Sequence, residues 1–167
     1  LEAVEESKNI VIAGHTSPDG DAIGACLALG MSIKNLGGNV KVLLENYIQP
    51  GIEKYDLIPG IELVTFDGYE NIECYLFISA DCGDKDRLGM AKDVFEKAVF
   101  KINIDHHSSN TNFADINIVK TDYSSTSEIM FEIIKGFSKI DDKIATDLYA
   151  GLHLDTGRFS HSCTTSN

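Results

Sequence analysis

Short runs of apolar residues alternate along the chain with longer stretches in which apolar positions recur every three or four residues. The apolar runs are Ile10–Ala13, Val40–Leu44, Tyr75–Ala80, Val99–Ile104 and Ile116–Val119. Their length and their content of β-branched residues are typical of buried parallel strands. The alternation predicts an α/β fold with an open, mainly parallel sheet flanked by helices.

Three of the other stretches have the spacing of amphipathic helices. The first lies between the first two apolar runs, is about sixteen residues long and ends before Gly37. A second helix is expected to begin at Ser125, because Ser125–Glu128 fits a capping box. A third is expected from about Asp141 and ends before Gly157. The apolar face of the first helix consists of Ile23, Cys26, Leu27, Gly30, Ile33 and Leu36.

The length of 167 residues and the apolar content of 43% are those of a single globular domain, expected to span residues 1–167. Within it, Asn46–Gly60 is the least regular segment and is expected to be a surface connection. The chain carries 14 Lys and Arg against 26 Asp and Glu, a net charge of −12. This charge repels duplex DNA and anionic lipid at long range, which excludes a nonspecific nucleic-acid coat protein. Carboxylates gathered around divalent cations can still form a locally positive site.

No apolar run approaches the roughly 18 residues of a membrane span, and the first residues lack the pattern of a signal peptide. We therefore expect a cytoplasmic protein without a membrane partner. The cysteines show no CxxC spacing, so reduced, buried thiols are expected rather than disulfides or a zinc site. They are Cys26, Cys74, Cys82 and Cys163.

Histidine and aspartate residues follow three of the predicted strands and end the last predicted helix. They are His15, Asp19 and Asp21 after the first strand, Asp81 after the third, Asp105, His106 and His107 after the fourth, and Asp155 in the helix. The carboxyl ends of parallel strands line one crevice, which is where ligands bind in open sheets. These residues are therefore expected to converge on one edge of the sheet.

Each cluster has an ordinary structural interpretation by itself. The sequence from Pro18 to Asp21 is typical of a turn before a helix, with Asp21 as N-cap, and it lacks the remaining ligands of an EF-hand. A nucleophile of the haloacid-dehalogenase type would follow its strand directly, whereas a loop precedes Asp19. The sequence Asp105–His107 alone fits a solvated strand end, and Asp155–Gly157 alone fits a helix C-cap. These interpretations do not explain why all the clusters occur at successive element ends.

Imidazoles mixed with carboxylates, without a thiolate, are the ligands of a borderline-hard cation such as Mn²⁺, with Mg²⁺ or Co²⁺ as substitutes. Four aspartates and two histidines exceed what one open catalytic metal needs. They suit two ions about 3.5–4 Å apart that share one carboxylate and clamp the attacking and leaving oxygens of phosphoryl transfer. The residues by themselves therefore predict a two-metal phosphoesterase.

Four segments of the chain resemble, in order, the motifs of the DHH phosphoesterase superfamily. They are His15–Ala25, Asp81–Asp84, Ile104–Asn110 and Gly151–Phe159. The implied ligands are His15, Asp19 and Asp81 for one Mn²⁺, and Asp21, Asp81, His106 and Asp155 for the other. The resemblance further implies that Asp81 bridges the two ions, that His107 contacts the scissile phosphate, and that Asp105 orients His106 as an outer partner.

Within this superfamily, Pro18–Ala25, Ser124–Lys135 and Leu148–Phe159 are similar to the bacterial nano-RNase branch. The resemblance implies an enzyme that removes mononucleotides from very short single-stranded RNAs and dephosphorylates 3′-phosphoadenosine 5′-phosphate. Members of that branch carry a C-terminal substrate domain, which is expected to be absent from residues 1–167. Manganese inorganic pyrophosphatases share the same ligands, and a non-catalytic nucleotide-binding sensor is the alternative from another class. A homodimer is compatible with each of these functions.

Residues near the expected metals are candidates for binding a substrate phosphate. Arg158 follows Asp155 by three residues and offers a planar set of donors that suits phosphate oxygens, while a surface arginine paired with an aspartate is the alternative. His161 is a second candidate on the same segment. Ser124, Ser125 and Thr126 offer hydroxyls and helix N-terminal amides to a phosphate, with plain helix capping as the alternative.

Overall fold

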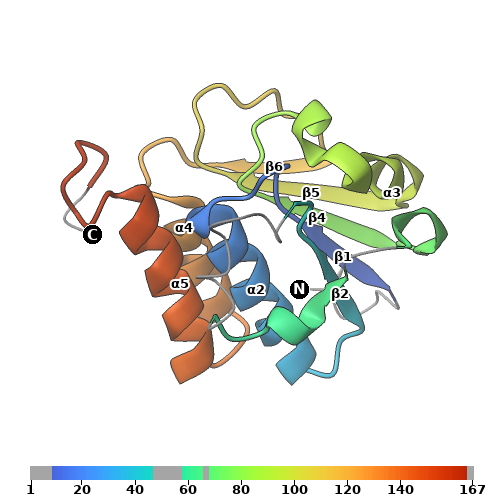
Figure 1. The fold of residues 1–167 in the computed structure, drawn as a ribbon, viewed down its shortest axis with the longest axis horizontal. Coiled ribbons are helices and arrows are strands. Elements are labelled where there is room, and N and C mark those ends of the chain that lie inside the picture. The colour runs from blue at the N-terminus through green and yellow to red at the C-terminus, as the bar shows by residue number, and fades with distance from the viewer. Residues whose placement is uncertain (1–8, 47–57, 66–67, 165–167) are drawn as a thin grey trace.

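The computed structural model describes residues 9–46, 58–65 and 68–164 (Figure 1). The described strands are β1 (Ile10–Ala13), β2 (Val40–Leu43), β3 (Val64–Thr65), β4 (Leu76–Ala80), β5 (Phe100–Asp105) and β6 (Ile116–Val119). The described helices are α2 (Gly20–Asn35), α3 (Lys92–Lys97), α4 (Thr126–Lys135) and α5 (Asp142–Asp155), with short 3₁₀ turns η2 (Ile61–Leu63), η3 (Tyr69–Asn71) and η4 (Lys85–Ala91).

The strands form one sheet in the order β3-β2-β1-β4-β5-β6, and every pair is parallel. This arrangement confirms the predicted α/β class. The chain runs from β1 to β2 and β3 on one side, and then returns to place β4, β5 and β6 on the other. The strand order therefore reverses between β1 and β4, which is the position at which open parallel sheets bind ligands.

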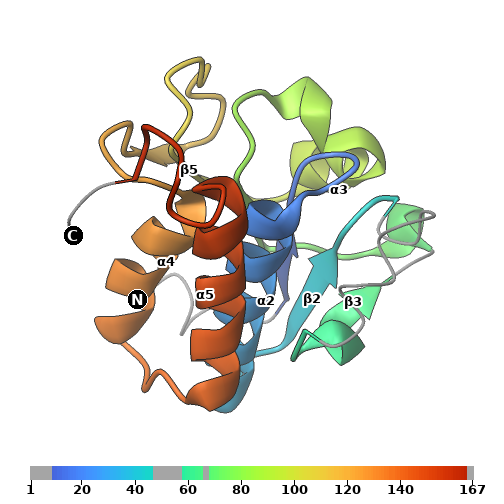
Figure 2. The same ribbon diagram turned by 60° about the vertical axis from the view of Figure 1, so that its left-hand side comes forward.

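The two faces of the sheet have separate hydrophobic cores. Ile10 and Ile12 of β1 point into the core beneath α2, α4 and α5. Val11 and Ala13 point to the opposite face, which is covered by α3 and η4. Figures 1 and 2 show the three longer helices together on one side of the sheet and α3 on the other. Alternation of apolar side chains on buried strands thus produces a three-layer fold.

The predicted element boundaries agree closely with the structure. The helix between the first two strands has 16 residues, but Leu36 lies beyond its end and is 57% exposed, so it does not belong to the apolar face. Ser125 and Asp141 are the N-caps of α4 and α5, as predicted. The sequence pattern did not indicate β3 or α3, which have two and six residues. The predicted surface connection Asn46–Gly60 falls mostly outside the described residues.

Glycines let α5 approach the other helices closely. A side chain at Gly24 of α2 would meet the backbone of Asp147 in α5, and one at Gly151 would meet Ser127 and Asp21. The close contact fixes the C-terminal end of α5 beside the N-terminal ends of α2 and α4. Asp155, the last residue of α5, is thereby brought to the edge of the sheet where β1, β4 and β5 end.

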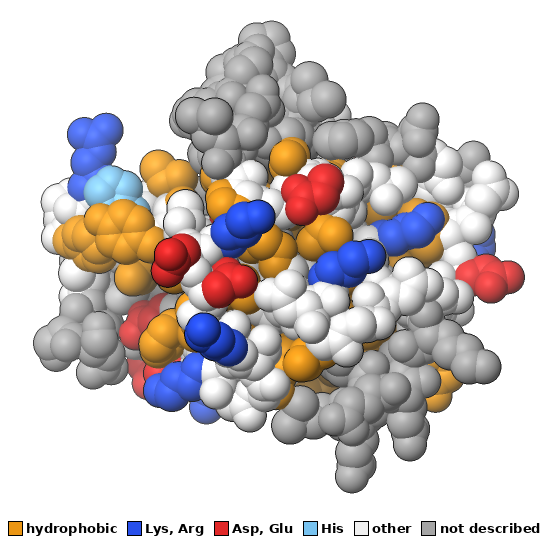
Figure 3. Space-filling view, turned by 90° about the horizontal axis from the view of Figure 1, so that it is seen from below, with side chains coloured by type: hydrophobic (Ala, Val, Ile, Leu, Met, Phe, Trp, Pro, Cys, Tyr) orange, Lys and Arg blue, Asp and Glu red, His pale blue; other side chains and the backbone are white. Residues whose placement is uncertain are grey.

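The structure also bears on the expectations about surface charge, membrane spans and cysteines. On the face seen from below, Lys and Arg side chains lie beside Asp and Glu side chains, with hydrophobic atoms between them (Figure 3). None of the described helices is long and apolar enough to span a membrane. All four cysteines are free thiols, and Cys26 and Cys82 are buried as predicted, whereas Cys163 is exposed.

Candidate metal centre

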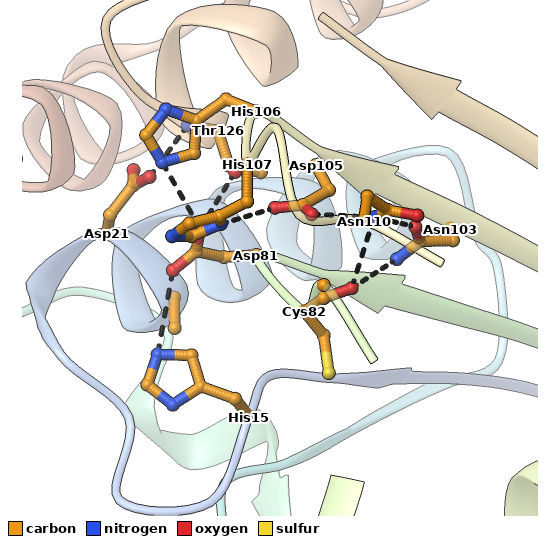
Figure 4. A network of polar contacts seen from close by, with 12 residues as sticks. His15, Asp21, Asp81, Cys82, Asn103, Asp105, His106, His107, Asn110 and Thr126 are labelled. Atoms are coloured by element: carbon orange, nitrogen blue, oxygen red, sulfur yellow. Dashed lines mark hydrogen bonds and ion pairs between the residues drawn. The ribbon is translucent and has the colours of Figure 1, made fainter. Parts of the chain in front are cut away.

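Asp81 lies at the centre of the His/Asp cluster, directly after β4 (Figure 4). Asp81 is 1% exposed, and its φ angle is +56°, a left-handed backbone conformation that aspartate tolerates better than most residues. One carboxylate oxygen is 3.6 Å from His15 Nε2. The other is 3.7 Å from His106 Nε2 and 3.6 Å from His107 Nδ1. Three imidazoles therefore surround a single buried carboxylate.

The six predicted ligands, together with His107, form three groups in which the donor atoms lie within 4.8 Å of one another. The groups are His15, Asp19 and Asp81; Asp81, His106 and His107; and Asp21, His106 and Asp155. Asp81 and His106 each belong to two groups, so all six predicted ligands are brought together in one cluster.

The spacing within the cluster fits bound cations. His15 Nε2 is 3.9 Å from an oxygen of Asp19, and His106 Nε2 is 3.7 Å from an oxygen of Asp155. These distances are too long for hydrogen bonds. Two atoms that each bind one cation at about 2.1 Å lie at most about 4.2 Å apart, so such pairs can share an ion. Nitrogen and carboxylate donors without a thiolate suit Mn²⁺ or a similar divalent cation.

His15 and Asp19 are held by backbone contacts at the end of β1. Nδ1 of His15 is 2.8 Å from the carbonyl oxygen of Thr16, which leaves Nε2 directed to the cluster. Burial lowers the pKa of His15, but contacts with Asp81 and Thr16 outweigh burial and raise the pKa overall. Asp19 Oδ1 accepts hydrogen bonds from the amides of Asp21 and Ala22, at 3.0 and 3.1 Å. Asp19, not Asp21, is therefore the N-cap of α2.

Asp21 is instead bound to the start of α4. Its carboxylate oxygens accept hydrogen bonds from the backbone amides of Thr126, at 2.6 Å, and Ser127, at 2.9 Å. Asp21 is 1% exposed, and burial together with the charge of Asp81 raises its pKa well above the usual range. The amides of a helix N-terminus bind anions readily, and here the anion is a side chain of the same protein.

This arrangement differs from the substrate contact expected of Ser125 and Thr126. Both residues are buried, and the Ser125 hydroxyl accepts a hydrogen bond from the amide of Glu128 at 3.1 Å. The Thr126 hydroxyl donates to Asp81 at 3.0 Å. The amide of Ser124 donates to the Glu128 side chain at 2.7 Å. The helix start is thus used for capping and for holding the metal ligands, and its first amides are not free for a phosphate.

His107 is paired with Asp105 behind the cluster. Nδ1 of His107 is 2.8 Å from Asp105 Oδ1. The carboxylate was expected to orient His106, but the structure places it against His107. The hydrogen bond with Asp105 raises the pKa of His107 to about 9.

Arg158 and His161 lie in the turn after α5, and both are exposed. Nδ1 of His161 is 3.1 Å from the backbone oxygen of Asp155, so its ring lies against the helix end. Arg158 has a φ angle of +62° and lines a surface pocket with His153, Leu154, Gly157 and Ser160. Their role in substrate binding stays a prediction.

Three further residues near the cluster were not identified from the sequence. Asn103 and Asn110 form hydrogen bonds around Asp105. Arg87 joins the segment after β4 to the His15 loop, because its backbone carbonyl oxygen accepts a hydrogen bond from the amide of Thr16 at 2.7 Å. The positive charge of Arg87 also partly offsets the rise in the pKa of His15 and of His107. A polar Asn103 inside an apolar strand was the available signal, whereas the contacts of Arg87 depend on the folded loop.

Comparison with known families agrees with the order of the motifs. The model described as "DHH family, N-terminal domain" matches residues 9–152 of the chain. A solved structure of an exopolyphosphatase-related protein from Bacteroides fragilis matches with a TM-score of 0.81 at 27% identity, covering 99% of this chain and 51% of that one. The fold is therefore shared with that protein.

Curated relatives carry names that describe nucleotide chemistry. The probable bifunctional oligoribonuclease and PAP phosphatase NrnA of Streptococcus mutans is 30% identical, with 99% of this chain and 51% of the relative covered. The bifunctional oligoribonuclease and PAP phosphatase NrnA of Thermus thermophilus is 31% identical, with 99% and 48% covered. The chain thus spans about half the length of these relatives.

Proposed function

The chain belongs to the DHH family, and from this membership we propose that it is a phosphoesterase that hydrolyses short oligoribonucleotides and 3′-phosphoadenosine 5′-phosphate with two Mn²⁺ ions. The observation that carries the proposal is the position of Asp81, whose two carboxylate oxygens face His15 on one side and His106 on the other. A carboxylate shared in this way suits a pair of cations. The names of the NrnA relatives support the choice of substrates.

The residues divide into two proposed sets of ligands. His15, Asp19 and Asp81 would hold one ion, and Asp81, Asp21, His106 and Asp155 would hold the other, with Mg²⁺ or Co²⁺ as substitutes for Mn²⁺. Such ions lower the pKa of bound water and stabilise charge on phosphoryl oxygens. The protein contributes fixed geometry: Thr16 orients His15, and the amides of α4 orient Asp21.

His107 and Asp105 act on the substrate side of this proposal. A protonated His107 donates one N–H to Asp105 through Nδ1. Its second N–H, on Nε2, is then free to donate to a phosphoryl oxygen of the substrate, where negative charge increases during the reaction. Asp105 keeps the ring in place and balances its charge. Arg158 and His161, beyond Asp155, are proposed to contact a second substrate phosphate.

A substrate panel tests the proposed function. The Mn²⁺-loaded chain is incubated with a 5′-phosphorylated diribonucleotide, with 3′-phosphoadenosine 5′-phosphate and with pyrophosphate, and the products are separated by chromatography. We expect mononucleotide from the first two and no release after chelation of the metal. Consumption of pyrophosphate alone would favour the pyrophosphatase alternative. Binding of nucleotide without turnover of any substrate would favour the sensor alternative. A homodimer and a cytoplasmic location stay predictions.

A further inference from the structure

We propose that Asn110, supported by Asn103, is a positioning residue for His107 and acts through Asp105. The two oxygens of Asp105 have different partners. Oδ1 lies 2.8 Å from Nδ1 of His107, and Oδ2 accepts a hydrogen bond from Nδ2 of Asn110 at 2.6 Å. Figure 4 shows the four side chains as one chain of contacts that leads from β5 to the His/Asp cluster around Asp81. The inference rests on the proposed function, because it assigns a purpose to the orientation of His107.

The amide of Asn110 is held in one orientation by its other bonds. A second N–H of Nδ2 donates to Oδ1 of Asn103 at 2.7 Å, and Oδ1 of Asn110 accepts from the amide of Asn112 at 2.7 Å. Rotation of this side-chain amide by 180° would place its oxygen against the carboxylate of Asp105, where both atoms are acceptors. The donor of Asn110 is therefore directed to Asp105.

Asn103 is held in turn by hydrogen bonds to β4 and to the loop that follows it. It is fully buried in β5, and its Nδ2 donates to the Ser79 hydroxyl at 2.8 Å and to the Cys82 carbonyl oxygen at 3.0 Å. Both N–H groups and the oxygen of Asn103 thus have partners. These bonds connect β4, the loop that contains Asp81 and the loop that contains Asn110. A network in which every polar atom is satisfied holds its members more rigidly than separate contacts do.

The network gives each oxygen of the fully buried Asp105 carboxylate its own hydrogen-bond partner. With Oδ2 occupied by Asn110, Oδ1 remains for the imidazole. The ring of His107 is then fixed with Nδ1 inward, which leaves Nε2 on its opposite edge for a substrate.

Two variants and a matched control test this role. Asn110→Ala removes the donor, and Asn110→Asp keeps the shape but replaces the donor with an acceptor. Asn117→Ala is the control, because Asn117 lies opposite Asn103 in the β5–β6 ladder and, among the described residues, its side chain bonds only to the backbone of Ala114. The control removes an asparagine of the same sheet without touching Asp105.

The first readout is independent of activity. In the metal-free chain with ¹⁵N-labelled histidine, the Nδ1 proton of His107 is identified by its loss in His107→Gln, and its exchange with water is measured by NMR. We expect exchange to be slow in the parent chain and in Asn117→Ala. It should become at least about 10-fold faster in Asn110→Ala and Asn110→Asp, because opening of the Asp105–His107 pair becomes easier. If Asn110→Ala fails to fold by circular dichroism, Asn110→Asp decides the outcome.

The second readout is kinetic. With Mn²⁺ and 3′-phosphoadenosine 5′-phosphate, Asn110→Asp should lower kcat by about 10-fold to 100-fold, since small displacements of a catalytic group have effects of this size. KM and the affinity for Mn²⁺, measured by calorimetry, should change by less than about threefold. Unchanged proton exchange in both Asn110 variants would overturn the inference. Altered exchange in a protein whose parent chain hydrolyses none of the substrates would support the positioning role and overturn the proposed function instead.

Discussion

Asp105 at the end of β5 and Asp147 in the middle of α5 are both fully buried, yet they have opposite electrostatic properties. Asp105 accepts hydrogen bonds through both oxygens, and its pKa is lowered. Among the described residues, neither oxygen of Asp147 has a hydrogen-bond partner. Burial, together with the charges of Glu62 and Asp141, raises the pKa of Asp147 to about 8. Burial alone therefore does not decide whether a carboxylate is charged in this protein.

The difference follows from the local backbone. Asp105 ends a strand, and the loop after it turns back so that His107 and Asn110 can donate to the carboxylate. Asp147 lies inside a helix, where the backbone amides are already bonded within the helix. The backbone of Asp147 lies against Gly24 of α2, and among the described residues its buried carboxylate has no hydrogen-bond donor. Strand ends can thus support buried charges that a helix interior leaves unpaired.

The largest expected difference is in metal binding, between variants in the His/Asp cluster at the strand ends and a variant of Asp147 in α5. Asp81→Asn keeps the shape and tolerates the left-handed backbone, but it removes the shared carboxylate, so occupancy of both proposed metal positions should be lost. Asp19→Asn should empty mainly one position. Asp147→Asn is the matched control outside the cluster and should bind two Mn²⁺ per chain. Calorimetry and metal analysis after dialysis measure the stoichiometry. Equal losses in Asp81→Asn and Asp19→Asn would contradict the bridging role of Asp81.

A smaller difference is expected in the catalytic rate, between substitutions of Asp105 and of Asp147. Asp105→Asn places an amide against His107 and removes the main cause of its raised pKa, so the catalytic rate should fall about 10-fold to 100-fold. The same substitution at Asp147 should leave the rate unchanged, because Asp147 does not contact the cluster. Initial rates with a diribonucleotide under saturating Mn²⁺ measure both variants. Similar losses in the two variants would mean that destabilisation, and not the contact with His107, is responsible.

The pH dependence of stability should report on Asp147. Its folded pKa, about 8, lies above 3.8, the ordinary pKa of an aspartate carboxyl, so the folded state holds this proton more tightly than the unfolded state does. Its contribution to stability is therefore full below about pH 4, decreases as the pH rises from about 4 to 8, and is lost above that range.

Asp147→Asn should remove this part of the pH dependence and raise the free energy of unfolding by about 1–3 kcal/mol at pH 8, because no charge then has to be buried. Urea unfolding at several pH values measures the difference between the variant and the parent chain. The groups whose charges act on Asp147 are Glu62 and Asp141. An identical pH profile in both proteins would show that Asp147 is already paired or hydrated.

The sequence predicted most of the strands and the residues of the His/Asp cluster, but it did not predict the partners of the buried aspartates. Apolar periodicity located five strands, and the rule that ligands gather at strand ends predicted a cluster of His15, Asp81 and His106. The partner of Asp105 could not be predicted, because the direction of the loop decides whether its carboxylate meets His106 or His107. Ser125 and Thr126 had two interpretations that sequence alone left open; in the structure Ser125 caps α4, and the amides of Thr126 and Ser127 donate to Asp21.

Asp147 was not identified at all. A single aspartate in an amphipathic pattern is expected on the solvent side of a helix, and the close approach at Gly24 and Gly151 is a tertiary feature. Sequence patterns therefore predict which residues gather at the site better than they predict which buried charges are neutralised.

The smallest expected effect concerns Arg158. This residue lies just beyond the C-terminal end of α5, the helix that contains Asp147. If the end of α5 belongs functionally to the strand-end region, Arg158→Lys should raise KM for 3′-phosphoadenosine 5′-phosphate by about threefold to tenfold, or about 1 kcal/mol, while kcat and the fold stay unchanged. The physical reason is that lysine presents a point charge, whereas arginine can bind two phosphate oxygens at once. Lys143→Ala is the control, because Lys143 is an exposed cation at the N-terminal end of α5, far along the helix from Asp155. Steady-state kinetics of the two variants give the answer: an unchanged KM in Arg158→Lys and also in Arg158→Ala would exclude Arg158 from substrate binding and would restrict the site to the residues that gather around Asp81.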